Sequence, residues 1–178
     1  FDERSEIVKG DLENLSTPYL VVDNAINFLQ DISQKHISNW KTSSAGKVIC
    51  ITGSNGKTTT KEMLSFLLQK VHGDEVLHTE GNLNNHIGVP LTILRLKSHH
   101  RYAVIEIGTS SPGEIETLSN MSCPDIGVIT SIGESHLEKL GDVKGVEKEK
   151  RALFEYVNDY SSLEVNAFYF ASGLLKDL

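Results

Sequence analysis

The sequence feature that most constrains the fold is a glycine-rich stretch, ITGSNGKTTTKEM, at residues 51–63. A run of β-branched residues, VICIT at 48–52, leads into it, and a helix-like pattern follows. Glycines allow backbone N–H groups to converge on one anion, and a helix N-terminus favours negative charge. The pattern therefore predicts a buried parallel strand, a phosphate-binding loop and a helix. The alternative is an ordinary glycine turn before a helix.

The residues of this loop have distinct expected roles. Lys57 is placed to reach the β and γ phosphates of ATP, and the hydroxyl of Thr58 or Thr59 is placed to help hold Mg²⁺. The spacing GxxGKT is shorter than the common GxxxxGKT because Ile51 occupies the position of the first glycine. The residues that we expect to bind ATP are Gly53, Ser54, Asn55, Gly56, Lys57, Thr58 and Thr59.

Strands and helices alternate along the rest of the chain. Apolar strands are predicted at 102–107 (YAVIEI) and 125–130 (DIGVIT). Between them, Ser111 as N-cap and Glu114 three residues later form a capping box, which predicts a helix start. The alternation predicts an α/β fold, a doubly wound and mostly parallel sheet with a P-loop and helices on both faces, in three layers. The apolar face expected for the helix after the loop consists of Met63, Leu64, Leu67, Leu68 and Val71.

Composition bounds the class of protein. At 178 residues with 39% hydrophobic content, the chain can bury one good core. Its 17 basic and 24 acidic residues give a net charge of −7, which argues against a nucleic-acid surface and requires any phosphate site to be built locally. Cys50 and Cys123 lack CxxC spacing, which favours reduced thiols and the cytoplasm. No apolar run reaches the length of a membrane span, and the start, without a signal-peptide pattern or initiator Met, indicates a fragment or processed chain.

Two further residues stand where ligands of α/β proteins collect. Glu106 ends an apolar strand at the same sheet edge as the loop, so it is a candidate Mg²⁺ ligand, with a helix-capping or paired glutamate as the alternative. His136 follows the next strand in SIGESHLE and is placed to bind a second metal ion or phosphate. A structural or solvated loop histidine is the alternative there.

Lys150 lies on the apolar stripe of the last clear helix, four residues after Val146 and three before Leu153. One interpretation is a snorkelling side chain. The other is a functional lysine, because partial burial lowers the pKa of an amine and a neutral amine reacts with CO₂ to give a carbamate, an anionic metal ligand.

Five segments, in order, resemble the central ATPase domain of the Mur ligases: TGSNGKTTTKEM, TEGNLNNHIGVPLT, VIEIGTSSPGEI, PDIGVITSIGESHLEKLG and GVEKEKRALF. The resemblance implies that Lys57 and its loop bind ATP, that Glu106 and His136 serve Mg²⁺ sites, and that Lys150 is carbamylated. The expected catalytic residues are Lys57, Glu106, His136 and Lys150, and the expected metal ligands are Thr58, Glu106, His136 and Lys150. Residues expected near a muropeptide are Asn82, Asn84 and Asn85, with loop and turn chemistry as their alternative role.

The resemblance implies ATP-driven amide formation in peptidoglycan precursor synthesis. The substrates would be UDP-N-acetylmuramoyl tripeptide and D-alanyl-D-alanine, joined through an acyl phosphate by a monomer. Three positions depart from the family pattern: Ser111 stands where relatives often have histidine, Ser135 replaces alanine, and Ala152 replaces the glutamate expected two residues after Lys150.

The chain is interpreted as three parts: residues 1–46 as the remnant of an N-terminal region with a linker helix, 47–160 as the central ATP-binding domain, and 161–178 as a divergent tail. A truncated homologue that binds nucleotide or a protein partner without ligating anything is the main alternative function. A folate-polyglutamate ligase is the other, and the TEGNLNNHIGVP stretch favours the cell-wall function over it.

Overall fold

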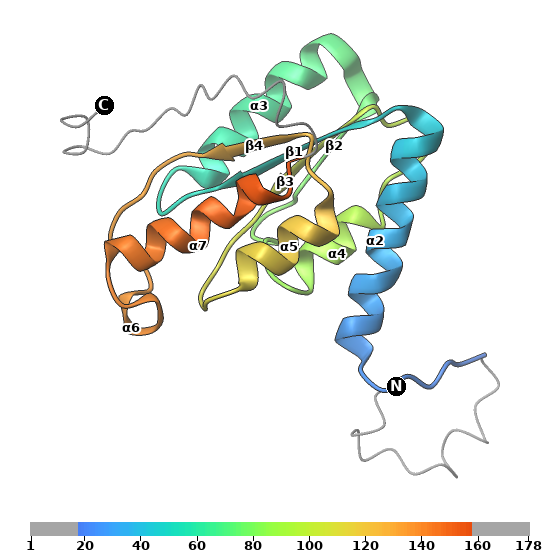
Figure 1. Ribbon diagram of the computed structural model, residues 1–178. Helices are drawn as coiled ribbons and strands as arrows, with labels where there is room; N and C mark the ends of the chain where they lie inside the picture. Colours follow the sequence, from blue (N-terminus) through green and yellow to red (C-terminus); the bar gives the residue numbers. More distant parts are fainter. Residues whose placement is uncertain (1–17, 158–178) are drawn as a thin grey trace.

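A four-stranded parallel sheet forms the centre of the molecule (Figure 1). The computed structural model describes residues 18–157. The strand order is β2-β3-β1-β4, so the strand before the glycine-rich loop is paired on both edges, as its β-branched run predicts. The strands are β1 (Lys47–Thr52), β2 (Val76–His78), β3 (Tyr102–Glu106) and β4 (Ile126–Ile129).

Helices cover both faces of the sheet, which confirms the expected three-layer α/β fold (Figure 1). One long helix, α3, packs on β1, β2 and β3 from one side. On the other side α4, α5 and α7 contact the strands, and α2 packs against α4 and α5. The helices are α2 (Ala25–Ser44), α3 (Lys57–His72), the 3₁₀ turn η1 (Gly73–Glu75), α4 (Gly88–Ile93), α5 (Glu114–Ser122), α6 (Leu137–Leu140) and α7 (Val143–Glu155).

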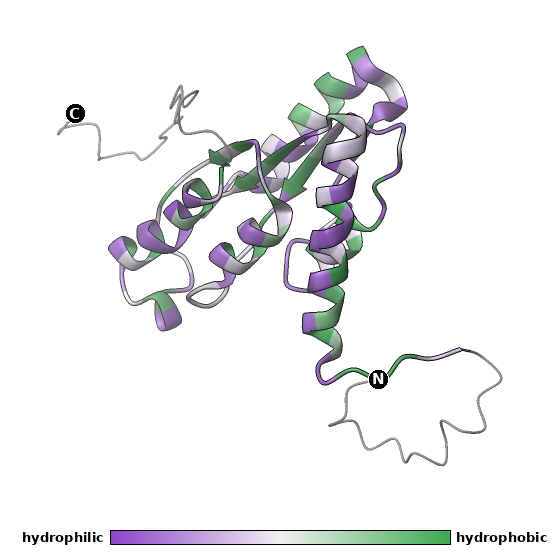
Figure 2. Ribbon diagram, turned by 45° about the vertical axis from the view of Figure 1, so that its right-hand side comes forward, coloured by the Kyte–Doolittle hydropathy of each residue, from purple (hydrophilic) through white to green (hydrophobic). Residues whose placement is uncertain are grey.

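Side chains of β1 alternate between two apolar layers, and the strands are hydrophobic along their length (Figure 2). Val48 and Cys50 join the core under α2, α4 and α5, whereas Ile49 and Ile51 pack towards α3. Fully burying an aliphatic side chain such as Ile51 contributes about 1.5–3 kcal/mol. The loop after β1 is therefore attached to one of the most firmly held segments of the chain.

The buried face of α3 matches the expected one only in part. Leu64 and Leu68 pack against the apolar layer on that side of the sheet, but Met63, Leu67 and Val71 are exposed, while Lys61 and Ser65 are buried. Apolar spacing alone cannot choose among neighbouring faces of a helix that has apolar residues over much of its circumference. The attachment of α3 to the loop at its N-terminus turns the polar residues inward.

The start of α5 also differs from the prediction. The helix begins at Glu114 with Gly113, at φ 83°, as its N-cap, so the assignment of Ser111 as N-cap is wrong. Glu114 still accepts a hydrogen bond from the Ser111 N–H at 3.1 Å, as in a capping box. The Ser111 hydroxyl instead accepts from Nζ of Lys139 at 3.0 Å. Sequence spacing identified the glutamate's role and missed the cap because a glycine occupies it.

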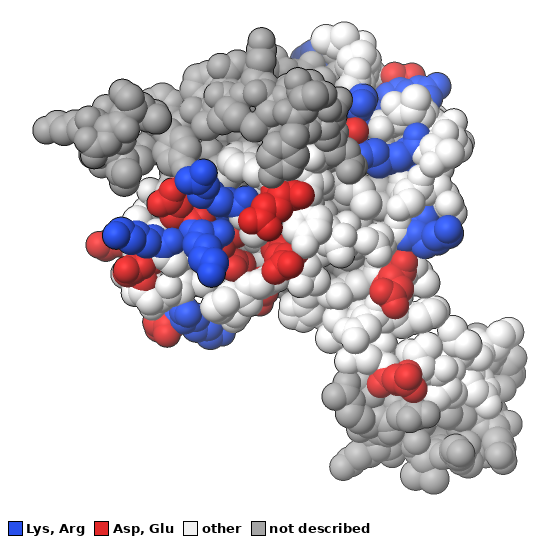
Figure 3. Space-filling model, viewed as in Figure 1, with Lys and Arg blue, Asp and Glu red and all other residues white. Residues whose placement is uncertain are grey.

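Charged side chains are interspersed on the face shown in Figure 3, where lysines, arginines and acidic residues lie together over α5, α6 and α7. None of the helices within residues 18–157 has the length and apolar character needed to cross a membrane. The predicted tail at 161–178 lies outside the described residues, as does most of the segment before the linker helix, which is α2.

Candidate active site

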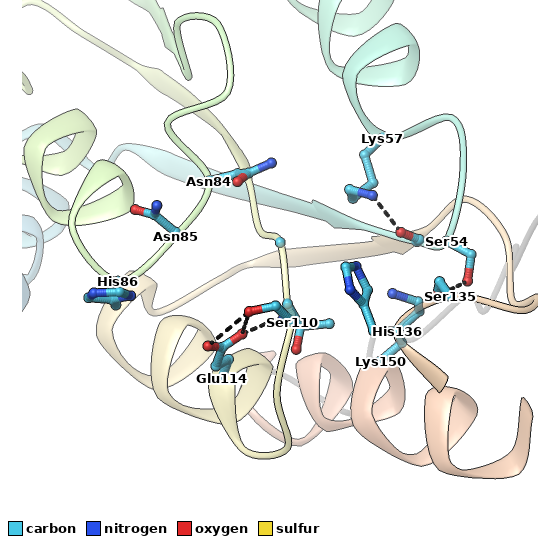
Figure 4. A pocket seen from close by; sticks show the side chains of 13 residues that line it. Ser54, Lys57, Asn84, Asn85, His86, Ser110, Glu114, Ser135, His136 and Lys150 are labelled. Carbon is cyan, nitrogen blue, oxygen red and sulfur yellow. Dashed lines mark hydrogen bonds between the residues drawn. The ribbon is translucent and has the colours of Figure 1, made fainter. Parts of the chain in front are cut away.

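A cavity of about 380 Å³ opens at the carboxyl ends of the strands (Figure 4). Its wall comes from the glycine-rich loop, from the segments that follow β2, β3 and β4, and from α7. Carboxyl ends of parallel strands lie along one sheet edge, which is why these distant segments meet. The lining residues are Gly53, Ser54, Lys57, Asn84, Asn85, His86, Gly108, Thr109, Ser110, Glu114, Ser135, His136 and Lys150.

The glycine-rich loop has a backbone that side chains would obstruct. Gly53 has φ 151° and Gly56 has φ 83°, and both angles lie in the region that favours glycine. A Cβ on Gly53 would lie 2.0 Å from Oγ1 of Thr130 in the segment after β4. That segment also fixes the loop, because Ser131 accepts hydrogen bonds from the N–H groups of Ser54 and Asn55 at 2.9 and 2.8 Å.

Lys57 folds back over this loop. Its Nζ donates to the carbonyl of Gly53 at 2.8 Å, across the mouth of the loop. Burial lowers the pKa of Lys57, and the nearby Glu106 carboxylate opposes that shift. Because the Gly53 carbonyl is the only acceptor of Lys57 among residues 18–157, Nζ can exchange that partner for a phosphate oxygen without breaking another hydrogen bond in this part of the chain.

Glu106 is the most confined charged residue of the site, with 1% of its surface exposed. Its Oε1 accepts hydrogen bonds from Oγ1 of Thr58 at 3.2 Å and from Nδ2 of Asn84 at 2.8 Å. Its Oε2 is buried without a hydrogen-bond partner among the described residues. An unsatisfied buried carboxylate oxygen is costly, and a cation beside it removes that cost.

His136 and Lys150 reach the cavity from the α6–α7 side, and their side chains lie next to one another in Figure 4. His136 precedes α6 with φ 50°, an uncommon backbone conformation for a non-glycine residue that occurs at functional sites. Lys150 is only 2% exposed, which does not fit a side chain that reaches out to bulk water. Burial, and then the charge of Lys57, lower the pKa of Lys150 to about 8, against the opposing effect of Glu149.

The three asparagines predicted near the substrate occupy different positions. Asn84 lines the cavity and binds Glu106, as described above. Asn85 also lines it, but its Oδ1 accepts from the N–H groups of Ile87 and Gly88 at the start of α4, which is the turn chemistry of the alternative role. Asn82 is exposed and is not part of the cavity wall.

Residues 51–169 match the family model of the Mur ligase middle domain. The chain belongs to the Mur ligase family. The resemblance inferred from the five sequence segments is thereby confirmed.

Relatives of this Mur ligase domain carry one recurrent name, UDP-N-acetylmuramoyl-tripeptide–D-alanyl-D-alanine ligase. The protein of that name from Buchnera aphidicola (subsp. Acyrthosiphon pisum) is 41% identical over 84% of this chain and 31% of its own length. The one from Bacillus subtilis is 43% identical over 74% of this chain and 27% of its own length. This chain therefore spans less than a third of either relative.

Solved structures give the same family. A crystal structure of MurF from Acinetobacter baumannii superimposes with a TM-score of 0.73 at 37% identity, over 78% of this chain and 30% of that one. MurF ligase from Thermotoga maritima, solved in complex with ADP, gives a TM-score of 0.71 at 30% identity, over 81% of this chain and 33% of that one.

Two glutamates for which the sequence patterns predict no role in the site help to shape it. Glu149 is 8% exposed and accepts from the N–H groups of Gly113 at 2.8 Å and Ile115 at 2.9 Å, so it caps α5 from α7. Glu114 accepts from the N–H of Ser110 at 2.5 Å and turns the segment after β3 along the cavity. The position of Glu149 beside Lys150 was the only available signal, and it does not reveal a partner that lies 34 residues away.

The three departures from the family pattern have different surroundings. Ser135 pairs its hydroxyl with that of Ser54 in the glycine-rich loop at 3.1 Å. Ala152 is half-buried against the main core and brings no polar group. Ser111 binds Lys139, as described above.

Proposed function

We propose that this domain supplies the ATP and Mg²⁺ site of a ligase that joins D-alanyl-D-alanine to UDP-N-acetylmuramoyl tripeptide. The observation that carries the proposal is the Glu106 carboxylate: its Oε2 is buried without a partner among the described residues, and its Oε1 is bound by the Thr58 hydroxyl just after the glycine-rich loop. The names of the relatives support the choice of substrates. Residues 47–160 are assigned to the ATP-binding unit, acting as a monomer.

The triphosphate is assigned to the loop at 53–59. The N-terminus of α3 offers unpaired N–H groups and the positive end of a helix dipole. Lys57 would leave the Gly53 carbonyl and donate to the β and γ phosphates, which places its positive charge where negative charge is transferred.

Mg²⁺ is assigned first to Glu106 and Thr58. The donor set fits a hard cation, because the Glu106 carboxylate, which has a free oxygen, lies next to the Thr58 hydroxyl. Bound there with ATP, the ion would neutralise phosphate charge. Asn84 donates to the same oxygen, Oε1, and so limits the rotation of the carboxylate while Oε2 stays free for the ion.

The second assigned metal position involves His136 and Lys150. Within residues 18–157 no three His, Cys, Asp or Glu side chains gather in a group that could hold a metal ion, so His136 needs oxygen ligands of another kind. The pKa of about 8 leaves about a tenth of Lys150 neutral at pH 7. That amine can add to CO₂, forming an N–C bond and releasing a proton, and the resulting carbamate supplies anionic oxygens beside His136.

The reaction assigned to the whole enzyme has two transfers. The tripeptide carboxylate attacks the γ-phosphorus, ADP leaves, and an acyl phosphate forms. The amine of D-alanyl-D-alanine then attacks the acyl carbon, loses a proton, and expels phosphate to give the amide. The contribution of this domain is positioning and charge neutralisation through Lys57 and the metal ligands.

Titration calorimetry of the full chain with ATP and Mg²⁺ tests this function. Lys57→Ala should abolish binding, whereas Lys70→Ala, an exposed lysine on the same helix α3, should bind as the wild type does. Equal binding by Lys57→Ala would contradict the loop assignment. Phosphate release that depends on both proposed substrates distinguishes the ligase from a homologue that only binds nucleotide.

A further inference from the structure

Two fully buried polar residues, Lys61 and Thr79, lie behind the site and are not used in the function proposed above. Each has 0% of its surface exposed. Lys61 belongs to α3, one turn beyond Thr58, and Thr79 directly follows β2. Nζ of Lys61 donates to the backbone carbonyl of Thr79 at 2.9 Å, and its charge is paired with the half-exposed Glu62 at 2.6 Å.

The contact of Lys61 changes the end of the β2–β3 ladder. The N–H of Thr79 donates to the carbonyl of Val104, and a regular parallel ladder would next pair the N–H of Glu106 with the carbonyl of Thr79. That carbonyl is bound by Lys61 instead. The N–H of Glu106 donates to the Thr79 hydroxyl at 2.9 Å.

Glu106 is consequently held from two directions by the same helix. Thr58 binds its carboxylate directly, and Lys61 fixes its backbone through Thr79. The two residues on α3 are three positions apart, so they lie on the same side of the helix. A shift of α3 or of the β2 end would therefore move the Glu106 carboxylate, with its unpartnered Oε2, relative to the Thr58 hydroxyl that binds Oε1.

A role in packing alone does not account for this pair. A buried amine and a buried hydroxyl both cost desolvation, and apolar side chains of similar shape would fill the same space without it. Here the two side chains replace the regular ladder bond: Lys61 binds the Thr79 carbonyl, and the Thr79 hydroxyl accepts from the backbone N–H of Glu106, the proposed metal ligand.

We propose that Lys61 and Thr79 are positioning residues that orient Glu106 for its divalent cation. The proposal rests on the function assigned above, because it concerns the same cation. It predicts that the hydroxyl at position 79 controls metal affinity while nucleotide affinity without metal is unaffected, since neither residue lines the cavity.

Thr79→Val and Thr79→Ser form the deciding pair. Valine keeps the shape and removes the hydroxyl, and serine keeps the hydroxyl. In the full chain, nucleotide binding is titrated against Mg²⁺ and repeated in EDTA, and Mn²⁺ binding is followed by electron paramagnetic resonance. Thr79→Val should raise the half-saturating metal concentration about tenfold, the lower end of the range for residues that orient metal ligands, while Thr79→Ser stays within about twofold of wild type.

A second pair of variants, at Lys61, distinguishes loss of the positioning contact from a folding defect. Lys61→Met should raise the half-saturating Mg²⁺ concentration in the same direction as Thr79→Val, and Lys61→Arg should restore part of the loss. A variant is folded if its circular dichroism spectrum and its nucleotide binding in EDTA are the same as those of the wild type. Equal metal titrations for Thr79→Val and Thr79→Ser, or equal losses with and without metal, would overturn the positioning role. If nucleotide binding by the wild type does not depend on Mg²⁺, the proposed function is wrong, and the positioning role is wrong with it.

Discussion

The hydroxyl of Thr58 lies 3.2 Å from Oε1 of Glu106, while Oε2 of the same carboxylate is buried without a partner in the described part of the chain. Thr58 lies in the first turn of helix α3 and Glu106 ends strand β3, so the contact joins the segment after the glycine-rich loop to the neighbouring strand. A buried carboxylate with one free oxygen is poised for a cation, and the first prediction follows from it.

Glu106→Gln should remove most of the Mg²⁺ dependence of ATP binding. The amide keeps the shape of the carboxylate but loses the charge that a cation requires, so the half-saturating Mg²⁺ concentration should rise at least about tenfold. Calorimetric titration at several Mg²⁺ concentrations measures it. Glu138→Gln, at an exposed position on α6, is the matched control. An unchanged Mg²⁺ dependence in Glu106→Gln would remove Glu106 from the metal site.

Gly53→Ala should lower both stability and nucleotide affinity. The added Cβ would lie 2.0 Å from Oγ1 of Thr130, and φ 151° is unfavourable for alanine. Strain of this kind costs about 1–3 kcal/mol in the free energy of unfolding. Gly133→Ala is the control, because a Cβ there meets nothing within 4 Å. Urea unfolding of the two variants compares them, and equal stabilities would show that the loop relaxes around the extra carbon.

Lys150→Met should stabilise the fold near neutral pH in CO₂-free buffer. The folded-state pKa of about 8 is below the ordinary 10.5, so burying the ammonium carries a penalty that is fully present below pH 8. Between pH 8 and 10.5 the unfolded chain holds a proton that the folded chain has released, and wild-type stability rises with pH. The advantage of methionine, about 3 kcal/mol at pH 7, should shrink across that window.

The free energy of unfolding of Lys150→Met and of the wild type, measured at several pH values, shows whether the advantage of methionine shrinks as the pH rises. Lys148→Met, on the exposed side of the same helix, should show no such trend. A pH-independent difference between Lys150→Met and wild type would mean that the Lys150 amine is as easily charged as one in water.

Carbamylation of Lys150 makes a separate chemical prediction. With ¹³C-labelled bicarbonate and Mg²⁺, the wild type should give a carbamate carbon signal that Lys150→Ala lacks. Short carboxylic acids should restore part of the lost activity in an assay of the full-length enzyme, since they can occupy the vacated carboxylate position. Full activity of Lys150→Ala without any addition would show that another residue completes the metal site.

Glu149→Gln should weaken the attachment of α5 to α7. Its carboxylate accepts from the N–H groups of Gly113 and Ile115, and a charged cap at a helix N-terminus contributes about 1–2 kcal/mol. Glu155→Gln, exposed at the end of the same helix, should change stability little. Thermal unfolding measures both variants, and equal midpoints would show that the α5 N–H groups find other acceptors.

Features whose signals are local could be predicted from the sequence alone. The β-branched run at 48–52 and the glycines after it predict a covered strand that runs through a glycine turn into a helix, and these are present as β1, the turn and α3. Phosphate binding by the turn stays a prediction. The alternation of strands and helices determined the three-layer fold. It also brought Glu106 and His136 to one edge, because parallel strands end on the same side. Their roles stay predictions.

Features that depend on partners distant in the chain could be found only from the packed fold. The buried face of α3 includes Lys61, whose acceptor lies beyond β2, and the cap of α5 comes from Glu149 on α7. Asn84 and Asn85 have the same residue type, yet one binds Glu106 and the other caps α4. The residue type determines which hydrogen bonds a side chain can make. Which donor meets which acceptor depends on how the layers pack, and the spacing of residues along the chain does not reveal which distant residues come into contact.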